Sequence, residues 1–194
     1  MAPVTMKPLA RRRARLAAGL LGLAVLALPQ LSIGQDNAPA EYAVKAAYLA
    51  KLRHYVEWPV RAGLPAGSRP VIATLGADEV AEHLLQMPAV KDAPGGFSVR
   101  RLRMGDSLDG VSVLFIGDAY FSRAGAMIDQ ANAKSVLVVS ESDSALQRGS
   151  VINFRLIDER IRFEISLESA DKSGLRLSSQ ILKLATTVIR EKRK

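Results

Sequence analysis

The run VSVLFI at Val111–Ile116 decides the fold class, because it is short, rich in β-branched residues and apolar on both faces. Two similar runs flank it in the chain, VIATL at Val71–Leu75 and VLVV at Val136–Val139. Strands that bury both faces are typical of a parallel sheet that helices cover on its two sides. The run Phe97–Arg103 is more polar and predicts a further strand nearer the edge of that sheet.

The segment Glu41–Glu57 predicts a long helix at the start of the domain. Pro59 disfavours helical geometry at Trp58 and cannot continue the hydrogen-bond ladder, so we expect the helix to end there. Trp58, the only tryptophan, is expected to be a buried aromatic anchor at that end. Apolar residues at helical spacing predict one buried stripe, which consists of Val44, Tyr48, Leu52, Tyr55 and Val56.

The last third of the chain follows a different pattern. Val151–Leu156 and Arg160–Ser166 alternate apolar and polar residues, which predicts an antiparallel hairpin with one solvated face, joined by Ile157–Glu159. The closing segment Ser179–Glu191 carries an apolar stripe at helical spacing and predicts a final helix. Further helices are predicted between the strands, over Glu79–Met87 and Ala119–Ala133.

These elements together predict an α/β sandwich. Its sheet is expected to be mixed and largely parallel, flanked by helices, with a C-terminal antiparallel hairpin plus helix. Residues 41–194 are assigned to it, because a segment of roughly 160 residues is typical of a single domain. The chain has no cysteine, so its stability is expected to come from packing rather than from disulfides.

An export signal is expected before that domain. The first fifteen residues hold five cations and no acid, and the apolar run Leu16–Leu28 is shorter than the ~20 residues that a membrane span needs. Ser32 and Gly34 offer small side chains at positions −3 and −1 of a cleavage site. Residues 1–34 are therefore predicted to be a Sec-type signal peptide and residues 35–40 a disordered leader, which places the product in the periplasm.

The basic charge of the chain is concentrated in that signal. The chain carries 27 Lys and Arg residues against 19 Asp and Glu, and five of the cations lie in the signal, so 22 against 19 remain after its removal. Nucleic-acid binding requires a concentrated basic face, so nucleic acid is not expected among the partners. No second apolar run is long enough to span a bilayer, and the mature product is expected to be soluble.

The sequence lacks the common motifs of catalytic chemistry. It has no thiol, no HExxH helix, no G-x-S-x-G elbow and no glycine-rich phosphate loop. The two histidines are His54, which lies off the apolar stripe of its helix, and His83, so a histidine-based metal site is not expected. No catalytic residue and no cofactor are predicted, and a hydrolase built on carboxylates and serines stays an alternative.

Polar residues after the three apolar strands form a candidate ligand cleft. Asp78 follows the first strand, Asp118 the second, and Ser140 with Glu141 the third. Ligands of open α/β sheets bind beyond the carboxyl ends of the strands, and an acidic rim here favours a cation or a polar small molecule over a phosphate. Helix capping is the alternative, because Asp78 and Asp118 also fit N-cap positions.

A second set of polar residues is a candidate for contact with a partner protein. It consists of Arg176, Ser178, Ser179, His54, Arg100 and Arg101. The last two lie on the predicted edge strand, where charge also guards against aggregation, and Arg160 and Arg162 add charge on the hairpin. Ser178 fits the N-cap of the final helix, where Arg176 could also hold an anion; capping alone is the alternative.

Sequence blocks spread over the mature chain carry a family resemblance. In chain order they are YLAKLRHYVEWP at Tyr48–Pro59, VIATLG, VLFIGD, VLVVS, GSVINF, IRFEIS and GLRLSSQILKLA at Gly174–Ala185. Their order and spacing resemble the YfiR family of small periplasmic proteins, and the resemblance runs from about Ala43 to Val188.

The resemblance implies regulation rather than catalysis. YfiR-like proteins repress an inner-membrane diguanylate cyclase by binding its periplasmic part. An outer-membrane-associated partner can capture the repressor, after which cyclic-di-GMP and biofilm formation rise. This chain has no GGDEF-type cyclase segment, so the resemblance makes it the regulator. A homodimer is one assembly that this interpretation allows, and a periplasmic small-ligand receptor is the alternative function.

Overall fold

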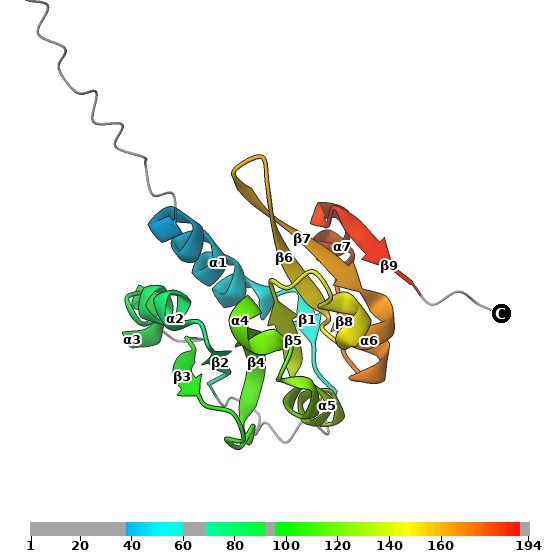
Figure 1. The fold of residues 1–194 in the computed structure, drawn as a ribbon, viewed down its shortest axis with the longest axis horizontal. Coiled ribbons are helices and arrows are strands. Elements are labelled where there is room, and N and C mark those ends of the chain that lie inside the picture. The colour runs from blue at the N-terminus through cyan, green and yellow to red at the C-terminus, as the bar shows by residue number, and fades with distance from the viewer. Residues whose placement is uncertain (1–37, 60–68, 92–95, 191–194) are drawn as a thin grey trace, which may run out of the picture. The chain divides into compact units, whose positions relative to one another are not determined.

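A computed structural model describes residues 38–59, 69–91 and 96–190. The predicted signal peptide lies outside the described residues. Seven strands form the main sheet in the order β3-β2-β4-β5-β6-β7-β9 (Figure 1). Their bounds are β2 Val71–Leu75, β3 Ser98–Leu102, β4 Val111–Ile116, β5 Leu137–Ser140, β6 Ile152–Ile157, β7 Arg160–Ser166 and β9 Thr187–Ile189.

The direction of the strands confirms the predicted α/β class. Neighbouring strands from β3 to β6 run parallel, β6 and β7 form an antiparallel hairpin, and β7 and β9 run parallel. β3 forms one edge of the sheet, as its polar sequence predicts. A separate two-stranded antiparallel sheet joins β1, Val56–Glu57, to β8, Arg176–Leu177.

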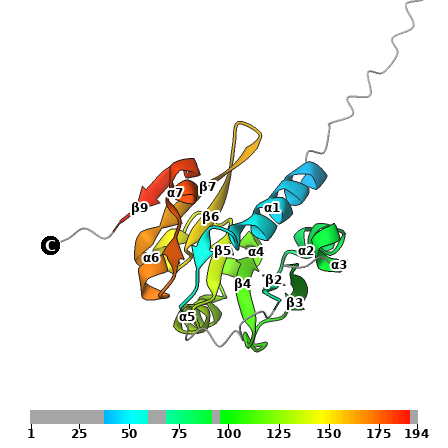
Figure 2. The same cartoon turned by 180° about the vertical axis from the view of Figure 1, so that it is seen from behind.

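Helices cover both faces of the main sheet. Their bounds are α1 Ala38–Leu52, α2 Asp78–Leu85, α3 Pro88–Lys91, α4 Asp118–Phe121, α5 Gly125–Ala133, α6 Leu167–Lys172 and α7 Ser179–Leu184. Phe115 of β4 packs in one core cluster with residues of α1 and α2, whereas its neighbour Leu114 packs in a second cluster with residues of α4 and α5. Successive side chains of a strand point to opposite faces, so α1 and α2, side by side in Figure 2, cover one face.

The first helix differs from its predicted extent. α1 begins at Ala38, so the last three residues of the expected leader are helical, and it ends at Leu52 rather than at Glu57. The chain then turns into β1, and the backbone N–H of Ser178 donates to the carbonyl of Tyr55 at 2.9 Å. Pairing with a segment more than a hundred residues away therefore overrides the helical periodicity of residues 53–57.

The side chains of residues 44–58 are not all buried as the predicted stripe requires. Leu52 and Val56 are buried, but Val44 is 42% exposed. Trp58 is half-buried against the core and its indole N–H has no hydrogen-bond partner, so it is a weaker anchor than predicted.

Two predicted helices are shorter than expected. The segment Ala119–Ala133 forms α4 and α5 with a turn between them, where the carbonyl of Ser122 accepts a hydrogen bond from Arg148 Nη2. The predicted closing helix ends at Leu184, and Thr187–Ile189 instead forms β9 beside β7. The β-branched residues at 186–189 suit a strand, and an uncovered strand edge is available to pair with them.

The β6–β7 hairpin is tighter than predicted. Asp158 and Glu159 alone form its turn, and both have positive φ, 48° and 57°, as a type I′ turn requires. Its polar face is only partly solvated, because Asn153 is buried and its Nδ2 lies 3.4 Å from Glu164 Oε2. Both views show the end of this hairpin projecting beyond the rest of the sheet (Figures 1 and 2).

Candidate functional site

A polar pocket of about 430 Å³ lies beyond the carboxyl ends of β4 and β5. Side chains from α1, from these strand ends and from β6 line it, and they are Glu41, Tyr42, Lys45, Asp118, Glu141, Asp143, Phe154, Arg155 and Leu156. The pocket occupies the place where open α/β sheets bind ligands.

Lys45 is the central charge of this pocket and is buried. Its Nζ forms ion pairs with the carboxylates of Glu41, one helical turn away, and Glu141, at the end of β5. Burial lowers the pKa of Lys45, but hydrogen bonds and charge attraction from Glu141 and Glu41 outweigh it, so its pKa lies above the usual value. The lysine therefore stays charged at neutral pH.

The structure brings together only part of the predicted ligand cleft. Asp118 and Glu141 both line the pocket, and the backbone N–H of Asp118 lies 3.4 Å from Glu141 Oε1. Ser140 is buried beneath them, and its hydroxyl donates to the carbonyl of Ile116 at 2.9 Å. Asp78 lies elsewhere, 3.8 Å from Arg101 Nε at the sheet edge. The expected acidic rim is thus partly neutralised by Lys45, which the sequence alone did not single out.

The capping alternative for the two aspartates is wrong. Ala77 and Gly117 occupy the N-cap positions of α2 and α4, and neither makes a side-chain capping hydrogen bond. Asp78 and Asp118 instead lie in the first turns, where a carboxylate still interacts favourably with the helix dipole.

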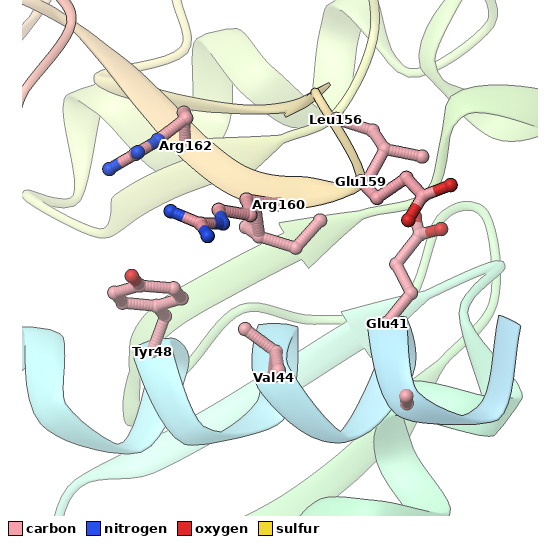
Figure 3. A pocket seen from close by; sticks show the side chains of 9 residues that line it. Glu41, Val44, Tyr48, Leu156, Glu159, Arg160 and Arg162 are labelled. Carbon is pink, nitrogen blue, oxygen red and sulfur yellow. The ribbon is translucent and has the colours of Figure 1, made fainter. Parts of the chain in front are cut away.

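A second hollow adjoins the polar pocket and shares Glu41 and Leu156 with it. We call it the α1–β7 groove; it measures about 500 Å³ and is lined by Ala40, Glu41, Val44, Tyr48, Leu156, Glu159, Arg160, Ile161 and Arg162. Figure 3 shows α1 along one side and the hairpin along the other. Its apolar lining is open to solvent, since Leu156 is 57% and Val44 42% exposed.

Charges in the α1–β7 groove are separated along its length. Arg160 and Arg162 extend toward the end at Tyr48, whereas Glu41 and Glu159 meet at the other end (Figure 3). Neither arginine takes part in an ion pair found among the described residues. An exposed apolar surface with separated charges is typical of a binding site.

The predicted partner residues lie at two places. Arg100 and Arg101 are on β3, where they bind within the protein: Arg100 donates to the carbonyls of Ser107 and Asp109, and Arg101 Nη2 lies 2.7 Å from Glu82 Oε1.

The remaining candidates surround the β1–β8 pair. Arg176 is exposed opposite Glu57, and His54 is exposed in the turn before β1. Ser178 is the N-cap residue of α7, as predicted, but its buried hydroxyl has no hydrogen-bond partner, and Ser179 begins the helix. None of the six predicted residues lines the α1–β7 groove.

The sequence pattern did not indicate this groove, and the reason is identifiable. The predicted helical stripe placed Val44 in the core, and the hairpin pattern gave no indication of which helix would lie beside it. The adjacent apolar residues Leu156 and Ile157, at the end of an otherwise alternating strand, were the available signal.

Two further observations bear on the kind of site. Over the described ranges 38–59, 69–91 and 96–190, no three histidine, cysteine or acidic side chains converge in a way that could hold a metal ion. In that same part of the chain no helix has the length and apolar character to cross a membrane.

Solved structures share the fold of this chain. A conserved domain protein from Vibrio cholerae O1 biovar El Tor is 13% identical, with a TM-score of 0.53. The ABC domain from Streptococcus pneumoniae, solved in complex with L-Trp, is 11% identical, with a TM-score of 0.50. Each match covers 76% of this chain and 60% of the other, so this chain spans about three fifths of their length. At these identities the likeness shows the fold alone.

Comparison with protein families gives a more specific result. None of the curated proteins matches the chain. The family model DUF4154, described as YfiR/HmsC-like, matches residues 42–186, which extend from α1 to the residue before β9. This match over most of the described fold shows that the chain belongs to the YfiR/HmsC-like family.

Proposed function

We propose that this protein is a periplasmic regulator that represses an inner-membrane diguanylate cyclase and thereby lowers cyclic-di-GMP and biofilm formation. The observation that carries the proposal is membership of the YfiR/HmsC-like family over residues 42–186. The α1–β7 groove supports it, because its solvent-exposed apolar side chains lie beside Arg160 and Arg162, which make no ion pair within the described part of the chain, and such a surface suits a protein–protein contact.

Repression by such a protein is a shift of an equilibrium. A regulator that binds the inactive cyclase more tightly than the active one moves the population toward the inactive state, and only by the difference of the two affinities. An outer-membrane-associated partner that captures the regulator would reverse the shift by lowering its free concentration. Both contacts require the protein to reach the periplasm, which the expected signal peptide would provide.

A gene deletion with two complementing chains tests this function. We expect the deletion to raise cyclic-di-GMP and surface attachment, and the full chain to restore the low state. A chain without residues 1–34 is the matched control and should fail to complement, because it would remain in the cytoplasm. Unchanged cyclic-di-GMP in the deletion strain, or full complementation by the shortened chain, would contradict the proposal.

A small-ligand receptor is the second candidate, and the pocket at the strand ends favours it. In that pocket Lys45 pairs with Glu41 and Glu141, and Arg155 pairs with Asp143. Asp118 takes part in no ion pair found among the described residues, so a ligand with a cationic group such as an ammonium suits the pocket. The structurally similar Streptococcus pneumoniae domain was solved with L-Trp, which makes amino acids sensible first probes. A ligand that binds only the folded protein must raise its melting temperature, so a thermal-shift panel decides this candidate.

A further inference from the structure

The lining of the α1–β7 groove shows that a strand edge borders it. Arg160, Ile161 and Arg162 are consecutive residues of β7, and all three line the groove. Side chains of consecutive strand residues point to opposite faces, so a hollow that touches all three faces the edge of the strand rather than one of its faces.

The backbone of that edge is free over the outer half of β7. β9 pairs with β7 only at Glu164–Ser166, and Thr186 donates to the carbonyl of Phe163, so among the described strands none pairs with residues 160–162 on that side. In a two-residue hairpin the residues that flank the turn are hydrogen-bonded to each other, and the pattern alternates from there. Ile161 and Phe163 therefore direct their backbone groups outward, as the bond from Thr186 to Phe163 confirms.

The charges of the groove specify what can bind there. An occupant needs acidic side chains near Arg160 and Arg162, at the Tyr48 end, and a basic side chain near Glu159, since Glu41 beside it already pairs with Lys45 (Figure 3). Between these ends, Val44 and Leu156 offer apolar contact area.

We propose that the α1–β7 groove binds an extended segment from the periplasmic part of the cyclase, which adds as a strand to the outer edge of β7. This segment carries acidic residues at one end, a basic residue at the other and apolar residues between. The proposal rests on the proposed function, because it names the surface by which the regulator would hold its partner. Backbone hydrogen bonds to Ile161 and to the N–H of Phe163, whose carbonyl already accepts from Thr186, give affinity in this mode of recognition, and the side-chain pockets give specificity.

Nuclear magnetic resonance on the protein purified from the periplasm tests the strand addition directly. The probes are an acetylated seven-residue peptide with two aspartates at one end, a lysine at the other and alternating valine and threonine between, and the peptide of reversed order. We expect one of them to shift the signals of Val44 and Tyr48 and to slow exchange of the Ile161 and Phe163 amides several-fold. The Arg160 and Arg162 amides, which already face β6, should change little.

Charge reversal supplies the matched comparison. Arg160→Glu with Arg162→Glu replaces attraction by repulsion at two exposed pairs and should weaken peptide binding about tenfold. Arg103→Glu, an exposed arginine beside the opposite sheet edge, should change it less than about twofold. A peptide with alanine in place of the aspartates and the lysine is the neutral control. Equal binding of that control, or binding that leaves the Ile161 and Phe163 amides unprotected, would overturn the proposal.

The same variants in the cyclic-di-GMP assay separate the two proposals. Loss of repression by the double variant, with normal repression by Arg103→Glu, supports both. If Arg176→Glu abolishes repression while the double variant does not, the partner surface lies around β8 and the groove proposal fails. If the wild-type chain does not repress at all, the proposed function fails, whereas the peptide experiment still decides whether the groove adds a strand.

Discussion

At the scale of single residues, Lys45 is the group on which the polar pocket depends. Lys45→Met should lower the free energy of unfolding by about 2 kcal/mol, because it leaves two partly buried carboxylates without their shared cation. Urea denaturation measures the loss. The variant that also carries Glu41→Gln and Glu141→Gln is the control and should recover most of it. Equal losses in the single and triple variants would show that packing, not charge, makes Lys45 important.

The pH dependence of that contribution follows from the sign of the pKa shift. The pKa of Lys45 is raised above 10.5 in the folded protein, so folding strengthens proton binding. The contribution of Lys45 to the free energy of unfolding is therefore fully present at pH values below its pKa in the unfolded chain. It is lost only as the pH rises through the higher pKa of the folded protein. Across the neutral range the pocket keeps its central positive charge.

Gly117, in the turn after β4, has no room for a side chain. A β-carbon there would lie 2.2 Å from the carbonyl oxygen of Gly76, which belongs to the turn after β2. Gly117→Ala should cost about 2–3 kcal/mol of stability, because two backbones must separate. Gly125→Ala is the control: its added carbon meets only a guanidinium nitrogen at 3.7 Å, so thermal denaturation should show little change. A stable Gly117→Ala protein would contradict this close approach.

At the scale of elements, the β6–β7 turn stores strain at the end of the groove. Asp158 and Glu159 both have positive φ, which only glycine adopts without cost. Glu159→Gly should therefore stabilise the protein by about 0.5–1 kcal/mol. Glu159→Ala removes the same charge but keeps a β-carbon, so it should not stabilise, and a chemical denaturation series distinguishes the two. Equal stabilisation by both variants would attribute the effect to charge.

The elements also show where local pattern fails. Residues 53–57 and 185–189 continue the apolar spacing of the helices before them, yet β1 and β9 form there. In each case a distant strand supplies hydrogen-bond partners, β8 for β1 and β7 for β9. Such pairing is non-local, so periodicity within a short window cannot detect it.

At the scale of the whole molecule, both hollows combine segments that are far apart in the chain. α1 contributes residues 40–48, and the hairpin contributes residues 156–162 to the groove. The polar pocket joins α1 to the ends of β4 and β5. A regulator that binds its partner here would therefore lose binding when α1 is displaced from the hairpin, although neither segment alone forms the surface.

The sequence by itself determined the fold class, the segments that form the parallel strands, and the hairpin, because apolar runs buried on both faces and alternating strands are local signals. It also placed Asp118 and Glu141 at strand ends, which the structure brings to one pocket. Only the tertiary structure decided that Lys45 pairs with Glu141, that Val44 faces solvent, and that α1 lies beside the outer edge of β7. These outcomes depend on which distant surfaces meet when the core is buried, and residue spacing along the chain carries no record of that packing.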